Sequence, residues 1–193
     1  VDRVAGVIDQ VDRVGELVSS MLDVSRADLG KLTIAPAPID AARLVQEVVG
    51  QFESQLGERK VVLVAPDELP VEWDPLRVQQ ILINLVTNAM RYAPEGDIDV
   101  TVMPGEGDTV AISVRDRGPG VPLHLRRRLF RLFYRMDGEE TANGRARHHG
   151  LGIGLYISAH LAEAHGGALS VDDAEGGGAV FTLTLPRVAT SQS

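Results

Sequence analysis

The stretch that decides the fold is HHGLGIGLYISAHLAEAHGG, residues 148–167. It places glycine at three alternate positions directly before a helical pattern, namely Gly150, Gly152 and Gly154. Glycine beside a helix costs about 1 kcal/mol relative to alanine, so this pattern predicts tight backbone geometry or a ligand close to the main chain. The spacing is not that of a P-loop, and Leu155 breaks the G-x-G-x-x-G dinucleotide fingerprint. The amides that open the following helix, at about 153–165, suit anionic phosphates.

The segments around this stretch predict a mixed sheet covered by helices. Capping and apolar periodicity predict helices that begin at Asp40 and at the pair Asp74-Pro75 and run to about Leu56 and Ala93. Runs rich in β-branched residues predict strands at 61–66, 98–103, 109–115, 168–171 and 179–185. This order favours an α+β fold, a two-layer α/β sandwich whose mixed sheet carries helices on one face, over a doubly wound domain.

Composition narrows the classes of function. The chain has 193 residues, of which 44% are hydrophobic, and this predicts a folded globular protein. A formal net charge of −8 gives no support to nucleic-acid binding. The chain lacks cysteine, which excludes disulfides and thiolate metal sites. The sequence shows no signal peptide and no apolar run long enough to span a bilayer.

Residues 1–32 carry a heptad-like stripe of apolar side chains: Val4, Val7, Val11, Val14, Val18 and Met21. So narrow a stripe predicts a long helix that packs against another helix, and we favour a bundle or dimer element over a single helix on its own domain. Prolines in LTIAPAPID (32–40) end this helix. We therefore expect a helical segment at 1–32, a linker at 33–37, a main domain at 38–187 and a tail at 188–193.

Two asparagines mark the helix ILINLVTNAMRYA, residues 81–93. Asn84 and Asn88 are four residues apart and share one face beside an apolar stripe. Amide oxygens suit Mg²⁺, which usually keeps phosphate oxygens in its shell, and Arg91 lies one turn further on. The alternative is that these asparagines cap local backbone or bond to each other.

A second polar motif ends a strand in VRDRGPG, residues 114–120. Asp116 could accept a hydrogen bond from an exocyclic amine while the glycines let a base lie on the backbone, although an ordinary Asp-Gly turn is the alternative. A long irregular segment then precedes the glycines, and its length is typical of an active-site lid, a basic surface loop or a docking surface. Its arginines are Arg126, Arg127, Arg128, Arg131, Arg135, Arg145 and Arg147, and Phe130 and Phe133 offer an apolar anchor.

The order of these motifs resembles the ATP-binding domain of sensor histidine kinases. The N-x-x-x-N helix, D-x-G-x-G, F-x-x-F, G-x-G-x-G and a final glycine-rich turn follow one another as in the GHKL superfamily, named for gyrase, the heat-shock chaperone, histidine kinase and MutL. The resemblance covers roughly residues 38–187 and implies the GHKL (Bergerat) ATP-binding fold. Residues 17–32 also resemble the second helix of the dimerisation and phosphotransfer hairpin.

The resemblance implies ATP and Mg²⁺ as ligands and assigns a role to each matching residue. Asn88 would bind Mg²⁺ with help from Asn84, Asp116 would accept from the adenine amine, and Asn84 and Arg135 would be catalytic. Phe130 and Phe133 would form the base of the lid, with Arg145 or Arg147 reaching phosphate. The full set of implied ATP-binding residues is Asn84, Asn88, Arg91, Tyr92, Asp116, Gly118, Gly120, Arg135, Gly150, Leu151, Gly152, Gly154 and Leu155.

Two positions depart from the family pattern. Ala179 stands where threonine is frequent in the last glycine box, so we expect the loss of one hydrogen bond and not of binding. None of the five histidines lies in the family's phosphoacceptor context, so we expect that histidine upstream of Val1 and regard the chain as a piece of a longer protein.

The implied activity is transfer of the ATP γ-phosphoryl group to this absent histidine and then to an aspartate of a response regulator. The resemblance further implies a homodimer through the N-terminal helix and a cytoplasmic domain, with any membrane anchor confined to a missing N-terminal region. An amide at position 84 cannot act as a base toward water, which argues against a gyrase-like or MutL-like ATPase. A serine kinase of the anti-sigma type and a degenerate nucleotide-binding module stay open as alternatives.

Overall fold

A computed structural model describes residues 21–27, 29, 32–135 and 151–189. The chain divides into two compact units, residues 1–32 and 33–193. In the first unit residues 21–27 are helical, and the rest of the predicted N-terminal helix lies largely outside the described residues. Among the described residues, no helix combines the length and the apolar character needed to cross a membrane. The expected domain limits stay predictions.

The second unit contains a mixed sheet of five strands in the order β2-β4-β5-β7-β6. β2 pairs with β4 in parallel, and the other neighbours are antiparallel. The strand bounds are β2 Val61–Val64, β4 Ile98–Pro104, β5 Thr109–Arg115, β6 Ala168–Asp173 and β7 Ala179–Pro186. The prediction of a mixed sheet is confirmed, with β6 two residues longer and β2 two residues shorter than expected.

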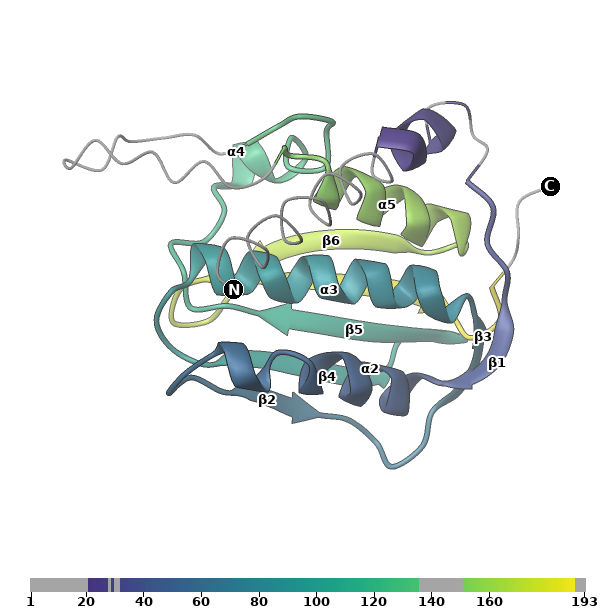
Figure 1. Ribbon diagram of the computed structural model, residues 1–193, viewed down its shortest axis with the longest axis horizontal. Coiled ribbons are helices and arrows are strands. Elements are labelled where there is room, and N and C mark those ends of the chain that lie inside the picture. The colour runs from purple at the N-terminus through teal and green to yellow at the C-terminus, as the bar shows by residue number, and fades with distance from the viewer. Residues whose placement is uncertain (1–20, 28, 30–31, 136–150, 190–193) are drawn as a thin grey trace, which may run out of the picture. The chain divides into compact units, whose positions relative to one another are not determined.

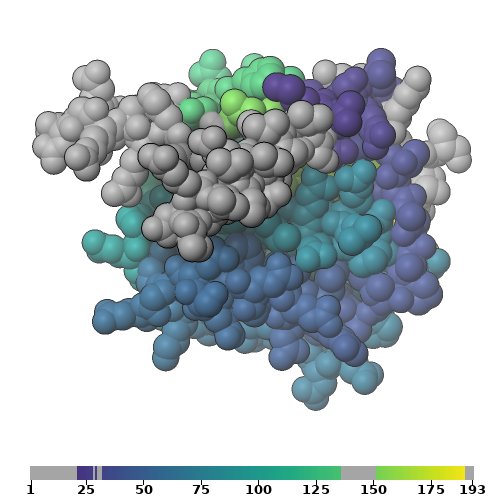
Figure 2. All heavy atoms as spheres, viewed as in Figure 1, coloured from purple at the N-terminus to yellow at the C-terminus, as the bar shows by residue number. Residues whose placement is uncertain are grey.

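Three helices cover one face of this sheet (Figure 1): α2 Ala41–Gly50, α3 Pro75–Tyr92 and α5 Gly154–Ala164. The blue atoms of α2 lie directly beside those of α3 in the space-filling view (Figure 2). Alternate strand residues such as Ile112 and Leu183 are fully buried, as are Leu82 and Leu85 of α3. The two-layer sandwich predicted from the sequence is therefore confirmed, and its core lies between the helices and the sheet.

Aspartate caps fix the starts of the two predicted helices. The Asp40 carboxylate accepts from the amides of Ala42 and Arg43, and Asp74 accepts from those of Leu76 and Arg77. The prediction that the first helix continues to Leu56 is wrong. It ends at Gly50, and a short 3₁₀ helix, η1 Glu53–Gln55, follows. Glycine lowers helix stability there, and the next amides bond three residues back, which tightens the chain.

A second small sheet went unpredicted. β1 Ala37–Asp40 pairs antiparallel with β3 Pro70–Trp73, so the expected linker already contains a strand residue at Ala37. The Glu72 amide donates to the Arg187 carbonyl, and the Glu72 carbonyl accepts from the Ala189 amide. The first residues of the expected tail are thus paired with β3. Four-residue strands with proline at the second or first position carry almost no period-two signal, which explains the omission.

Candidate nucleotide site

Asn84 on α3 is joined to α5. Its side-chain amide donates to Ser158 Oγ at 3.0 Å, and Ser158 is 2% exposed. A Cβ atom added to Gly154 would lie 2.8 Å from Asn84 Cγ and closer still to its amide oxygen. Gly154 is therefore required because the Asn84 carboxamide occupies the space that any larger side chain would need. The structure brings together these two predicted site residues.

Asn88 lies one turn further along α3 and differs from Asn84. Its side chain is half-buried, and no hydrogen bond reaches its carboxamide from the residues that the structure describes. The hydroxyl of Thr87, which lies between them in the sequence, donates to the carbonyls of Ile83 and Asn84, so it is hydrogen-bonded within the helix. The Asn88 carboxamide is thus available to a ligand, whereas the amide nitrogen of Asn84 is committed to Ser158.

Asp116 follows directly after β5 and is 5% exposed. Its Oδ1 accepts from the amides of Gly118 at 2.8 Å and Ala179 at 3.2 Å, and its own amide donates to the Ala179 carbonyl at 2.9 Å. Among the described residues no hydrogen bond reaches the second oxygen, Oδ2. One carboxylate oxygen is therefore fixed by two backbone donors, and the other remains able to accept from a ligand.

The turn after Asp116 lies against the end of α3. A Cβ atom on Gly118 would lie 2.9 Å from the Tyr92 carbonyl, and Gly120 has a φ of 76° with the Gly178 carbonyl 3.0 Å from its added Cβ. The turn therefore requires glycine at both predicted positions. Tyr92 is 46% exposed, and neighbouring Arg91 is also exposed, without a hydrogen bond or ion pair to any described residue.

The two described flanks of residues 136–150 are hydrogen-bonded to each other. The Phe133 amide donates to the Gly152 carbonyl at 3.1 Å, and both residues have positive φ, 59° and 70°. A Cβ atom on Gly152 would lie 2.8 Å from the Tyr134 carbonyl and 3.2 Å from Arg135 Cγ. The predicted lid base and the middle glycine thus come together, and Arg135 lies beside them. Gly150, Arg145 and Arg147 lie outside the described residues.

The start of α5 has no side-chain cap, because Ile153 occupies the N-cap position. Its first amides therefore face away from the helix without a side-chain acceptor, as the sequence pattern predicts for an anion site. Leu151 is exposed and Leu155 is half-buried.

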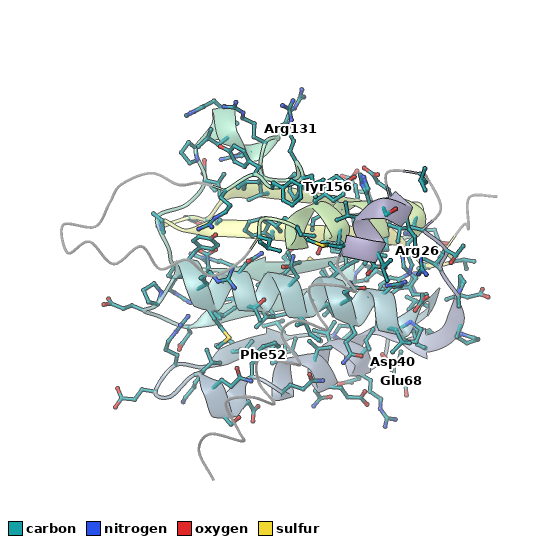
Figure 3. The ribbon with its side chains drawn as sticks, turned by 45° about the horizontal axis from the view of Figure 1, so that its top comes forward. Arg26, Asp40, Phe52, Glu68, Arg131 and Tyr156 are labelled. Carbon is teal, nitrogen blue, oxygen red and sulfur yellow. The ribbon has the colours of Figure 1, made fainter. Side chains whose placement is uncertain are left out.

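One of the clustered arginines serves the fold instead. Arg126, at the end of the short helix α4 Leu123–Arg126, pairs with Asp172 at 3.1 Å and with Asp173. These ion pairs attach α4 to β6. Arg131 projects outward from the segment that follows α4 (Figure 3). The arginine cluster is therefore divided between structural and exposed members.

The far ends of α3 and α5 are also joined to each other, away from the polar groups above. The Asp74 amide donates to His165 Nε2 at 3.2 Å, and the His165 Nδ1 lies 2.7 Å from the Leu161 carbonyl. This pattern requires a neutral imidazole with the proton on Nδ1. Burial lowers the pKa of His165, an effect only partly offset by the Leu161 carbonyl and Asp74.

Three contributing residues were missing from the predicted site: Ser158, Gly178 and the backbone of Ala179. Ser158 is a buried hydroxyl on the apolar side of α5, and that conflict between polarity and burial was a usable signal. A Cβ atom on Gly178 would overlap the Asp116 backbone. This contact joins the end of β5 to the start of β7, which are far apart in the sequence, so spacing along the chain does not predict it. Within the described residues, no group of three or more His, Cys, Asp or Glu side chains could hold a metal ion.

Comparisons with known proteins agree with this geometry. Residues 73–189 match the family described as histidine kinase-, DNA gyrase B-, and HSP90-like ATPase. The adaptive-response sensory kinase SasA of Trichormus variabilis is 34% identical over 181 residues, which cover 92% of this chain and 44% of SasA. The sensor protein KdpD of Rathayibacter rathayi is 35% identical over 88% of this chain and 19% of KdpD.

A solved structure agrees over almost the whole chain. Full-length ShkA in complex with AMPPNP superimposes with a TM-score of 0.82 at 27% identity, covering 99% of this chain and 39% of ShkA. The chain thus spans less than half the length of each of these relatives. Because the family model covers most of the chain and includes every described site residue, the chain belongs to the family of histidine kinase-, DNA gyrase B- and HSP90-like ATPases.

Proposed function

We propose that this chain is the ATP-binding part of a sensor histidine kinase and that it supplies the γ-phosphoryl group to a protein histidine. The observation that carries this choice within the family is Asn84, whose amide nitrogen donates to Ser158. An amide held in this way cannot remove a proton from water, so hydrolysis lacks a general base at this position. The sensor kinases among the relatives support the same choice.

The residues present fit a magnesium-bound triphosphate. The Asn88 carboxamide oxygen accepts no hydrogen bond among the described residues, and Arg91 one turn away is a free cation among them. We propose that Asn88 ligates Mg²⁺ and that Arg91 contacts phosphate. Bound Mg²⁺ would neutralise phosphate charge, while this chain's own residues orient the nucleotide for in-line transfer. Asn84 would assist metal binding indirectly, because its bond to Ser158 holds α3 against α5.

Asp116 supports recognition of adenine. Its Oδ1 is held by two backbone amides, so its Oδ2 is fixed in position and accepts no bond within the described residues. An exocyclic amine is the donor that such an oxygen would select. A guanine carbonyl at the same place would meet a carboxylate without a proton between them, so ATP should be preferred over GTP.

The start of α5 supports phosphate binding. Its amides lack a side-chain cap, and a helix start of this kind suits the anionic oxygens of a phosphate. Arg135 lies beside Gly152 and is the described arginine nearest to this turn. We propose that these amides and Arg135 hold the transferring end of the triphosphate.

The acceptor and partners follow from the same proposal. The phosphorylated histidine would belong to the dimerisation hairpin, whose second helix residues 17–32 resemble, and the phosphoryl group would pass on to an aspartate of a response regulator. We propose a homodimer through this hairpin. A family ATPase, a serine kinase and a non-catalytic module are not favoured, because Asn84 lacks basicity and the ligand-binding groups are retained.

A transfer experiment tests this function. The chain is mixed with Mg-ATP labelled at the γ position and with a separately supplied helical hairpin that carries a histidine. We expect acid-labile label on the hairpin, and none on a hairpin in which glutamine replaces that histidine. Release of inorganic phosphate at the same rate with either hairpin, without labelled protein, would assign the chain to the ATPases of its family instead.

A further inference from the structure

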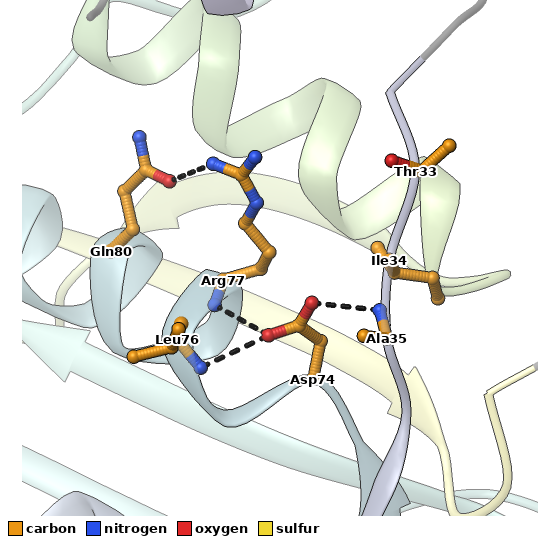
Figure 4. A pocket seen from close by; sticks show the side chains of 7 residues that line it. All are labelled: Thr33, Ile34, Ala35, Asp74, Leu76, Arg77 and Gln80. Carbon is orange, nitrogen blue, oxygen red and sulfur yellow. Dashed lines mark hydrogen bonds between the residues drawn. The ribbon is translucent and has the colours of Figure 1, made fainter.

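The carboxylate of Asp74 holds together two segments that are far apart in the sequence. Oδ1 caps α3 through the amides of Leu76 and Arg77, and Oδ2 accepts from the Ala35 amide at 2.8 Å (Figure 4). Asp74 is 7% exposed, so solvent competes little for these bonds. Residues 33–36, which enter the second unit in chain order, are thereby attached to the first turn of the helix that carries Asn84 and Asn88.

The same residue also reaches α5. The Asp74 amide donates to His165 Nε2, and His165 is fully buried at the end of that helix. Ten residues further along, in the middle of α3, Asn84 bonds to Ser158 and occupies the space above Gly154. α3 and α5 are therefore connected at two points, which lie about 15 Å apart along α3 and about 10 Å apart along α5, since each residue of a helix rises 1.5 Å. We expect a helix pair joined at two separate points to move as one body.

From these contacts we propose that Asp74 is a positioning residue, whose carboxylate couples the conformation of residues 33–36 to the α3–α5 pair and hence to nucleotide affinity. The inference rests on the proposed function for its ligand. It concerns a different part of the molecule, because Asp74 touches none of the groups assigned to ATP. A segment that is ordered before binding reduces the ordering cost at binding, so release of Ala35 should weaken the nucleotide complex.

Two substitutions break this bond from opposite sides and keep the helix cap. Asp74→Asn retains an oxygen for Leu76 and Arg77, and asparagine is as good an N-cap as aspartate, but its amino group cannot accept from Ala35. Ala35→Pro removes the donor, and Ala35 already precedes Pro36, which restricts it to extended conformations that proline tolerates.

Asp40→Asn is the matched control. Asp40 also caps a helix, and its Oδ1 accepts from Ala42, Arg43 and the distant Leu69 amide. Among the described residues no bond reaches its second oxygen, so the same chemical change leaves every acceptor in place. Asp40 lies beside Glu68 (Figure 3) and caps α2, a helix that carries none of the proposed nucleotide residues.

The test measures Mg-ATP affinity of the 193-residue chain in a double-mutant cycle. We expect Asp74→Asn and Ala35→Pro each to raise the Kd about fivefold, and the double variant to raise it by no more than either alone, because both remove one bond. Asp40→Asn should leave the Kd unchanged. The proposal would be overturned if the fold-changes in Kd of the two single variants multiplied in the double variant, or if Asp40→Asn raised the Kd equally. Asp74 would then be a helix cap only.

Hydrogen exchange without nucleotide separates this inference from the proposed function. Amides of α5 should exchange severalfold faster in Asp74→Asn and Ala35→Pro than in the wild type or in Asp40→Asn. If the wild type fails to bind Mg-ATP while this exchange pattern appears, the proposed function is wrong and the coupling stands. If α5 exchange is unchanged in both variants, the coupling is wrong whatever the nucleotide affinity.

Discussion

The two ends of the α3–α5 helix pair differ in how completely their polar groups are bonded. At the Asp74 end both carboxylate oxygens, the backbone amide and both nitrogens of His165 have partners. At the other end the Asn88 carboxamide and Asp116 Oδ2 have none among the described residues, and the first amides of α5 lack a side-chain cap. Buried polar groups are normally satisfied, so the incomplete end indicates a ligand and the complete end indicates structure.

The same contrast holds within one helix. Asn84 and Asn88 have the same side chain and lie one turn apart, yet Asn84 is bonded to Ser158 and Asn88 is bonded to no described residue. The sequence pattern treats the two as a pair, and the structure separates them into a residue that joins helices and a residue that is available to a ligand. Perturbations at the two ends should therefore have different signatures.

The largest effect is expected from Gly154→Ala. The new methyl group would displace the Asn84 carboxamide and break its bond to Ser158, which combines overpacking with loss of a buried hydrogen bond. We expect a loss of about 3 kcal/mol in the free energy of unfolding, measured in urea. Gly50→Ala, at the exposed last residue of α2 where an added Cβ atom would meet nothing within 4 Å, is the control for loss of one glycine. Equal stability of wild type and Gly154→Ala would refute the packing argument.

A smaller and more selective effect is expected from Asp116→Asn. The retained oxygen can still accept from Gly118 and Ala179, but the amino group cannot accept from adenine. ATP affinity should fall by about 2 kcal/mol, near thirtyfold, while the melting temperature changes little. Calorimetric titration with ATP measures the affinity, and thermal unfolding measures the melting temperature. Undiminished ATP affinity in this variant would remove Asp116 from the site.

The smallest effect concerns pH and the fully bonded end. Burial lowers the native pKa of His165 below the unfolded value of 6.5. Its contribution to stability is therefore complete above about pH 6.5 and is lost as the pH falls toward the lower native value. Each pH unit lost in that window should cost up to about 1.4 kcal/mol. His165→Gln should remove this part of the pH dependence of unfolding, and exposed His124→Gln should retain it. A wild-type slope that survives in His165→Gln would assign the effect to another group.

Much of the fold was predictable because its signals are local. The Asp74-Pro75 start of α3 and the period-two strands β5 and β7 each depend on residues close in the sequence. The end of α2 was misjudged because the apolar stripe continues past Gly50 while the backbone tightens. β1 and β3 were missed because pairing of two short strands depends on tertiary contact and not on their own pattern.

The sequence indicated candidate residues for the site but not the hydrogen bonds that join them to other elements. Residue types and order singled out Asn84, Asn88 and Asp116 as candidates, and their roles stay predictions. Two of the bonds that hold them join distant residues: Ala179 lies 63 positions from Asp116, and Ser158 lies 74 positions from Asn84. His165, 91 positions from Asp74, gave no signal beyond being a histidine in a helical stretch. Spacing along the chain reports one element at a time, so contacts between elements need the structure.

The most direct test of the central claim is calorimetric titration of ATP into the wild type and Asn88→Ala, each with and without Mg²⁺. Because the Asn88 carboxamide bonds to no described residue, its removal should leave the melting temperature nearly unchanged. The account predicts that Mg²⁺ strengthens ATP binding to the wild type by about tenfold or more, a typical effect of a group that supports a metal site. Asn88→Ala should lose this gain. Full magnesium enhancement in Asn88→Ala, or no association of ATP with the wild type, would contradict it.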